Sequence, residues 1–106
     1  MINLIVTVTT LPGRVDEYVA AFARIAPQVR LEEGCIEYEL YRDSDDPRFD
    51  NKVRPDTVII CEKWESIELL QAHSRNSQPL IEFRQAVKDV KLNSTYVLLS
   101  PLVRAQ

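Results

Sequence analysis

Apolar and polar residues alternate over residues 2–10, and this period of two predicts a β-strand with one buried face. The sequence Leu11-Pro12-Gly13 then breaks the strand. From residue 15 onward, apolar positions recur every three or four residues, which predicts a helix with one apolar stripe. That stripe consists of Val15, Tyr18, Phe22, Ile25 and Val29. We expect the helix to end at Glu33-Gly34, with Gly34 as its C-cap.

Two further strands are predicted on either side of a polar loop. Residues 35–41 alternate, and residues 57–64 open with the continuous apolar run Val58-Ile59-Ile60-Cys61. Such a run is typical of a strand that is buried on both faces. The loop between the strands, residues 43–56, is unusually long and charged for a small domain. The apolar face of the first of these strands is expected to hold Ile36, Tyr38 and Leu40.

Two short helices and a last strand complete the pattern. Ser66 is a good N-cap for the first helix and Ser77 for the second, whose first turn tolerates Pro79. The apolar or chemically interesting positions on these helices are Leu69, Leu70 and His73, and then Leu80, Phe83, Val87 and Val90. The last strand is expected over about residues 95–99, whose final four residues are apolar.

The order β-α-β-β-α-β predicts an α+β domain of the ferredoxin-like type, and we expect one such domain over residues 1–106. Helices of this pattern cover only one face of a four-stranded sheet, although the third and last strands are apolar on both faces. The uncovered face therefore favours packing against a second copy of the chain. The sequence predicts a homodimer.

Composition removes several classes of protein. Apolar residues make up 45% and charged residues 27% of the chain, as in soluble globular domains, and the formal net charge is −3 with scattered basic residues. We therefore expect no nucleic-acid partner. No apolar run approaches the roughly 18 residues of a membrane span, and the first residues do not resemble a secretion signal, so a cytoplasmic protein is expected. In that compartment Cys35 and Cys61 are expected as free thiols.

The chain has a single histidine, His73. Its imidazole is suited to proton transfer near neutral pH, although a lone histidine near a helix end more often packs beside its neighbours or interacts with the helix dipole. One histidine and two distant cysteines do not supply an ordinary metal-ligand set, so no metal is expected. The acidic run Asp43-Ser44-Asp45-Asp46 lacks the glycine and the final glutamate of a calcium loop, and we interpret it as solvated.

Glu62 and Trp64 share the strand face of Val58 and Ile60, so a carboxylate and an indole point toward an apolar layer. A buried carboxylate is costly unless it is paired or faces a cavity. One interpretation is an arginine bridge to Glu62 with Trp64 as part of the core. The other is a substrate pocket near His73, nine residues after Trp64. The aromatic wall of that pocket is then expected to be formed by Tyr18, Tyr38 and Phe83.

Short motifs along nearly the whole chain, from about residue 4 to residue 101, form a recognisable set. They are Pro12-Gly13, Glu32-Glu33-Gly34-Cys35 with Tyr38, Glu62-Lys63-Trp64-Glu65-Ser66, and Ala72-His73. With these motifs in this order and spacing, the chain resembles the antibiotic biosynthesis monooxygenase family. The residues of its motifs are most similar to those of the quinol monooxygenase branch.

The resemblance implies a dimeric α/β barrel made from two ferredoxin-like sheets. It also implies oxygenation of quinols or related phenolic and polycyclic aromatic molecules by dioxygen, without flavin, haem, metal or another cofactor. Trp64 would then line the substrate pocket and His73 would transfer the proton, with Glu62 as the next candidate for the base. Many members carry a second histidine in a Thr-Pro-His segment, where this chain has Ser77-Gln78-Pro79-Leu80.

Other activities of the same fold remain as alternatives. Haem degradation is not expected, because the residues that the haem-degrading relatives use on their first strand and later helices are not matched here. A small-molecule isomerase or detoxifying enzyme is the first alternative. A dimer that binds an aromatic ligand without turnover is the second.

Overall fold

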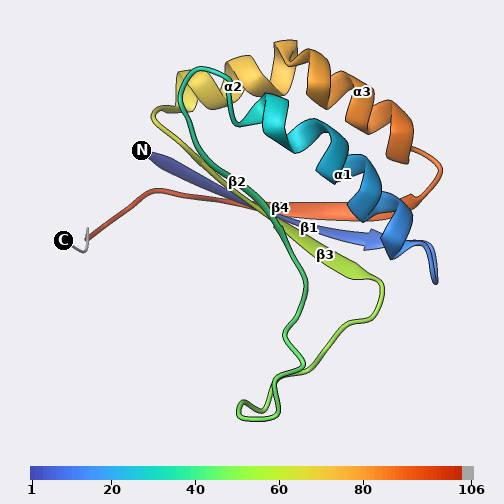
Figure 1. Cartoon of the computed structure of the whole chain (residues 1–106). Helices are drawn as coiled ribbons and strands as arrows, with labels where there is room; N and C mark the ends of the chain where they lie inside the picture. Colours follow the sequence, from blue (N-terminus) through green and yellow to red (C-terminus); the bar gives the residue numbers. More distant parts are fainter. Residues whose placement is uncertain (104–106) are drawn as a thin grey trace.

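The computed structural model describes residues 1–103 and places four strands and three helices in that part of the chain. In chain order the elements are β1 (Ile2–Thr10), α1 (Val15–Val29), β2 (Cys35–Tyr41), β3 (Thr57–Trp64), α2 (Ile67–Asn76), α3 (Gln78–Val87) and β4 (Lys91–Leu99). The strands form one antiparallel sheet in the order β2-β3-β1-β4. The helices lie together on one side of this sheet (Figure 1). This arrangement confirms the predicted ferredoxin-like α+β fold.

The core lies between the helices and the covered face of the sheet. Alternate residues of β1 and β3 point into it, including Val8, Val58 and Ile60, and the stripe of α1 packs against them. Both predicted N-caps are present. The hydroxyl of Ser66 accepts a hydrogen bond from the backbone N–H of Leu69 and that of Ser77 from Leu80, each at 3.2 Å. Each cap of this kind contributes about 1 kcal/mol to helix stability.

The prediction for the end of the first helix was wrong. α1 ends at Val29, and Gly34 lies in the following turn with φ of +83°, not at the helix C-cap. The turn forms because the backbone N–H of Glu32 bonds three residues back to the carbonyl of Val29, which tightens and ends the helix. A Cβ at Gly34 would clash with the side chain of Leu69, so this turn packs closely on α2.

Two strand details also differ from the prediction. A register shift between Cys35 and Glu37 turns Ile36 outward, and half-buried Cys35 packs on the core in its place. β4 begins at Lys91, four residues earlier than predicted. It pairs along β1 as far as Thr10, and its first residues are polar and carry no apolar signal.

β4 is at an edge of the sheet, and all nine of its residues are exposed in the single chain. A single chain therefore does not bury both faces of β4, which the sequence predicted to be buried. Tyr96 is the most exposed of its large apolar side chains, at 72%. The loop of residues 43–56 extends from the sheet on the side opposite the helices (Figure 1).

Within residues 1–103, no helix combines the length and the apolar character that crossing a membrane requires.

Candidate active site

Five polar or aromatic side chains meet between the sheet and the helices, and we call them the His73 cluster. They are Glu32, Glu62, Trp64, His73 and Ser77. Glu62 and Trp64 come from the covered face of β3, His73 from the last turn of α2, and Ser77 from the junction of α2 and α3. Glu32 lies in the turn between α1 and β2. Four elements of the fold are therefore needed to assemble this cluster.

The position of His73 follows from the way α2 begins. Ser66 caps the helix directly after β3, and about two turns of helix then return His73 over the end of that strand. The imidazole lies against the indole of Trp64, with ring centroids 4.7 Å apart. His73 is only 5% exposed and Trp64 is fully buried, so the two rings meet out of water. The packing of α2 thus brings together the two residues that the sequence singled out.

Both nitrogens of His73 face carboxylates. Its Nδ1 lies 2.8 Å from Oε1 of Glu32, within hydrogen-bond distance. Its Nε2 lies 3.9 Å from Oε1 of Glu62, which is too long for a direct hydrogen bond. One side of the imidazole is therefore held by Glu32, while the other side lies near Glu62 without a direct hydrogen bond to it.

Glu62 is a buried carboxylate whose hydrogen-bond partner is the indole. Nε1 of Trp64 donates to Oε1 of Glu62 at 3.0 Å, in place of the arginine bridge that one interpretation of the sequence expected. Burial raises the pKa of Glu62 above its ordinary value, and the indole hydrogen bond and the nearby charges of His73 and Arg84 oppose this only in part. Glu62 is therefore a buried carboxyl group with a raised pKa, 3.9 Å from the imidazole of His73.

Of the three aromatic residues that the sequence proposed as a pocket wall, only Tyr38 contacts the imidazole. Tyr38 meets His73 edge to face, with ring centroids 5.6 Å apart. Tyr18 and Phe83 pack against each other at 5.1 Å, and Phe22 joins them to Tyr38 by stacking on it at 5.0 Å. Burial and the negative charge of Glu62 raise the pKa of Tyr18 and Tyr38, so both phenols stay neutral.

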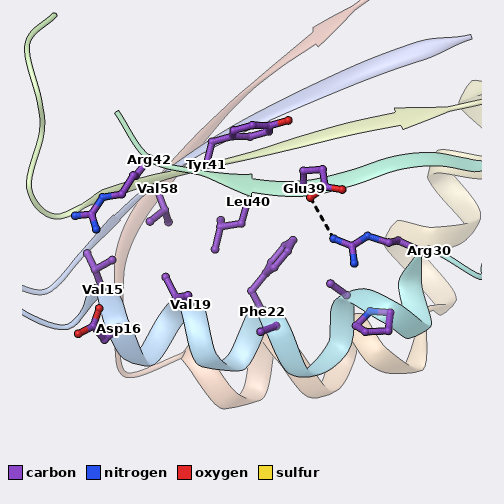
Figure 2. Close-up of a pocket in the computed structure, with 13 residues that line it drawn as sticks. Val15, Asp16, Val19, Phe22, Arg30, Glu39, Leu40, Tyr41, Arg42 and Val58 are labelled. Carbon is purple, nitrogen blue, oxygen red and sulfur yellow. Dashed lines mark hydrogen bonds and ion pairs between the residues drawn. The ribbon is translucent and has the colours of Figure 1, made fainter. Parts of the chain in front are cut away.

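A groove of about 490 Å³ lies between α1 and β2. Figure 2 shows the side chains that line it. Val19, Phe22, Leu40 and Val58 give it an apolar floor, and a 3.2 Å ion pair between Arg30 and Glu39 lies at one end. The described residues that line it include Phe22 but no member of the His73 cluster. The stacked rings of Phe22 and Tyr38 therefore separate this groove from His73.

Sequence reasoning missed Glu32 and Ser77 as parts of the cluster. The hydroxyl of Ser77 donates to Oε2 of Glu32 at 2.6 Å while it also caps α3. Both residues were noticed for other reasons, Glu32 as part of a motif and Ser77 as a cap. Glu32 lies 41 residues from His73 and 45 residues from Ser77 in the chain, and no local sequence pattern indicates contacts over such separations.

No group of three or more His, Cys, Asp or Glu side chains within residues 1–103 is arranged to hold a metal ion. The donors of the His73 cluster instead bind one another.

Comparison with known proteins gives a consistent picture. Residues 1–89 match the family described as "Antibiotic biosynthesis monooxygenase". The chain is 31% identical over 103 residues to the "Probable quinol monooxygenase YgiN" of Escherichia coli K12, covering 95% of this chain and 98% of that protein.

Solved structures show the same fold at lower identity. PA3566 from Pseudomonas aeruginosa superposes with a TM-score of 0.79 at 22% identity, covering 96% of this chain and 94% of that one. Rv0793 from Mycobacterium tuberculosis superposes with a TM-score of 0.79 at 23% identity, covering 99% of this chain and 98% of that one.

Proposed function

The chain belongs to the antibiotic biosynthesis monooxygenase family, and from this premise we propose that it oxygenates a quinol or a related phenol with dioxygen and without a cofactor. The observation that carries the proposal is the buried contact of His73 with Trp64 and Glu62, which joins a proton acceptor to an apolar aromatic surface. The name of the E. coli relative supports the choice of a quinol.

For this reaction the protein needs only to accept a proton from the substrate and to exclude water from the site. Nε2 of His73 removes the proton of a phenolic hydroxyl, and the electron-rich phenolate then reduces dioxygen directly. One oxygen atom enters the ring and the other leaves as water with two hydrogens of the substrate. All the electrons that dioxygen accepts come from the substrate, so no external reductant is consumed.

The side chains around His73 have separate tasks in this scheme. The indole of Trp64 and the ring of Tyr38 pack on the imidazole and keep its surroundings apolar and free of water. Glu62 lies near Nε2 and receives the proton from the imidazolium, because its raised pKa makes it a better acceptor than an exposed carboxylate.

We place this site in a homodimer. The support is the bare outer side of the sheet and the exposed strand β4, which a second copy would cover. Sedimentation at micromolar concentration is expected to give a dimer. A 12.2 kDa particle over the whole concentration range would contradict this part of the proposal.

The activity is tested by oxygen uptake with a panel of hydroquinones and anthrones, in the presence of a chelator and of catalase. We expect one dioxygen consumed for each oxygenated product. A change in Trp64 fluorescence without oxygen uptake would contradict the proposal in favour of a ligand-binding protein. An isomerised product without uptake would contradict it in favour of an isomerase.

A further inference from the structure

Glu32 occupies a fixed position beside the imidazole. The backbone N–H of Glu32 bonds to the carbonyl of Val29 at 2.9 Å, and its carbonyl accepts from the N–H of Cys35 at 3.1 Å. Two residues later, the carbonyl of Gly34 accepts from the N–H of Glu65 at 2.9 Å, which ties the turn to the end of β3. The backbone that carries Glu32 is therefore fixed at both ends of its turn.

The side chain of Glu32 has one partner for each oxygen. Oε1 lies 2.8 Å from Nδ1 of His73, and Oε2 accepts from the hydroxyl of Ser77 at 2.6 Å. Ser77 is itself held in place because its oxygen caps α3. The carboxylate is only 22% exposed, so water competes little for these two bonds.

This geometry selects one of the two tautomers of the neutral imidazole. An ionised carboxylate only accepts hydrogen bonds, so Nδ1 must carry a proton to bond Glu32 at this distance. In neutral imidazole the lone pair then lies on Nε2, the nitrogen that lies 3.9 Å from Oε1 of Glu62. The opposite tautomer would set a lone pair against the carboxylate and leave no acceptor at Nε2 for a substrate proton.

We propose that Glu32 is a positioning residue, which fixes the Nδ1–H tautomer and the ring orientation of His73 so that Nε2 acts as the base. The inference rests on the proposed function only for its kinetic consequence. The tautomer itself is a property of the free protein.

The chain allows a direct test because His73 is its one histidine, so every imidazole signal in a nuclear magnetic resonance spectrum comes from this residue. With ¹⁵N-labelled histidine, the ring nitrogen shifts of the wild-type protein are expected to show a protonated Nδ1 and an unprotonated Nε2. In Glu32→Ala we expect a mixture of tautomers. Glu32→Gln, which keeps an acceptor oxygen, is expected to restore most of the wild-type pattern.

Glu33→Ala provides the matched control. It removes an exposed carboxylate from the same turn and leaves the contacts of His73 in place, so its imidazole spectrum should equal that of the wild type. In oxygen uptake, Glu32→Ala should lower kcat by about tenfold or more with little change in KM, as expected when a base loses its orienting carboxylate.

The outcomes separate the two proposals. A wild-type protein with Nε2 protonated, or a Glu32→Ala spectrum equal to the wild type, would overturn the role of Glu32 whatever the activity. The expected spectra together with a protein that consumes no oxygen would overturn the proposed function and leave the role of Glu32 standing. If Glu32→Ala fails to fold, the wild-type and Glu32→Gln spectra still decide between these results.

Discussion

The His73 cluster and the loop of residues 43–56 both bring carboxylates close to nitrogen cations or rings, yet their electrostatics are opposite. In the loop, Asp43 binds Arg54 at 2.8 Å and Asp46 binds Arg48 at 2.7 Å, both near solvent. The guanidinium of Arg54 lowers the pKa of Asp43 to about 2. In the cluster, Glu62 has an indole for its partner, and burial raises its pKa.

The contrast shows that the density of charge along a sequence is a poor guide to reactivity. The loop carries five aspartates, and the arginine partners of Asp43 and Asp46 lower the pKa of these two carboxyl groups. Glu62 stands alone in an apolar strand, and for that reason its proton affinity is altered. Perturbed groups of this kind gather at functional sites, which favours the cluster over the loop as the active site.

The largest effect is expected from His73→Ala, which should lower kcat by about a hundredfold or more because the base is removed. Steady-state oxygen uptake with the best hydroquinone measures this loss. His73→Asn is the matched variant, since its amide can still donate to Glu32 but cannot act as a base. A rate near the wild-type value in either variant would make His73 a packing residue.

Trp64→Phe should act mainly on substrate binding. Phenylalanine keeps an aromatic ring but loses part of the stacking surface and the N–H that bonds Glu62. KM should therefore rise by about five- to tenfold, the effect of about 1 kcal/mol of aromatic contact. Phe49→Leu is the control, because Phe49 is an exposed aromatic residue of the loop. An equal change in KM for both variants would argue against a substrate contact at Trp64.

Glu62→Gln should stabilise the protein at neutral pH while it slows turnover. The folded state raises the pKa of Glu62 above its ordinary value of 4.5, so ionisation at higher pH costs the folded state and not the unfolded one. Replacing the charge should therefore increase the free energy of unfolding by about 1 kcal/mol at pH 7. Below about pH 4.5 both states are protonated, and the advantage should disappear. Thermal unfolding across this pH range would contradict the account if the variant were less stable at pH 7.

Asp43→Asn is expected to give a small effect of the opposite sign. The folded state lowers the pKa of Asp43 from 3.8 to about 2, so its ionised form adds stability above pH 4 that is lost as the pH falls toward 2. At pH 7 the variant should have a slightly lower Tm than the wild type, and the difference should vanish near pH 2. Asp45→Asn, at an exposed neighbour, is the control. A Tm for Asp43→Asn above that of the wild type at pH 7 would contradict the stabilising role of the ionised Asp43.

Much of the fold was predictable because its signals are local. The alternation in β1 and β3, the stripe of α1 and the serine caps of α2 and α3 each lie within a few residues of one another. The wrong predictions concern segments whose own sequence carries no signal of their structure. The polar start of β4 is a strand only because it pairs with β1, and the bulge at Cys35 depends on the neighbouring strand.

The candidate site divides in the same way. The contact of His73 with Trp64 follows from a strand, a cap and two turns of helix, all within a short stretch of sequence. Glu32 reaches His73 across 41 residues, through a turn that the sequence assigned to the helix. Such a contact depends on how the layers pack, so only the structure reveals it.

The central claim is that His73 takes the proton of a phenol inside a dry aromatic site. An anaerobic titration with a chromophoric phenol tests this most directly, because a phenolate absorbs at longer wavelength than its neutral form. At a pH below the pKa of the free phenol, the wild-type protein should bind it as the phenolate, and His73→Asn should bind it as the neutral phenol. A neutral phenol bound to the wild-type protein, or the same phenolate band with both proteins, would contradict the account.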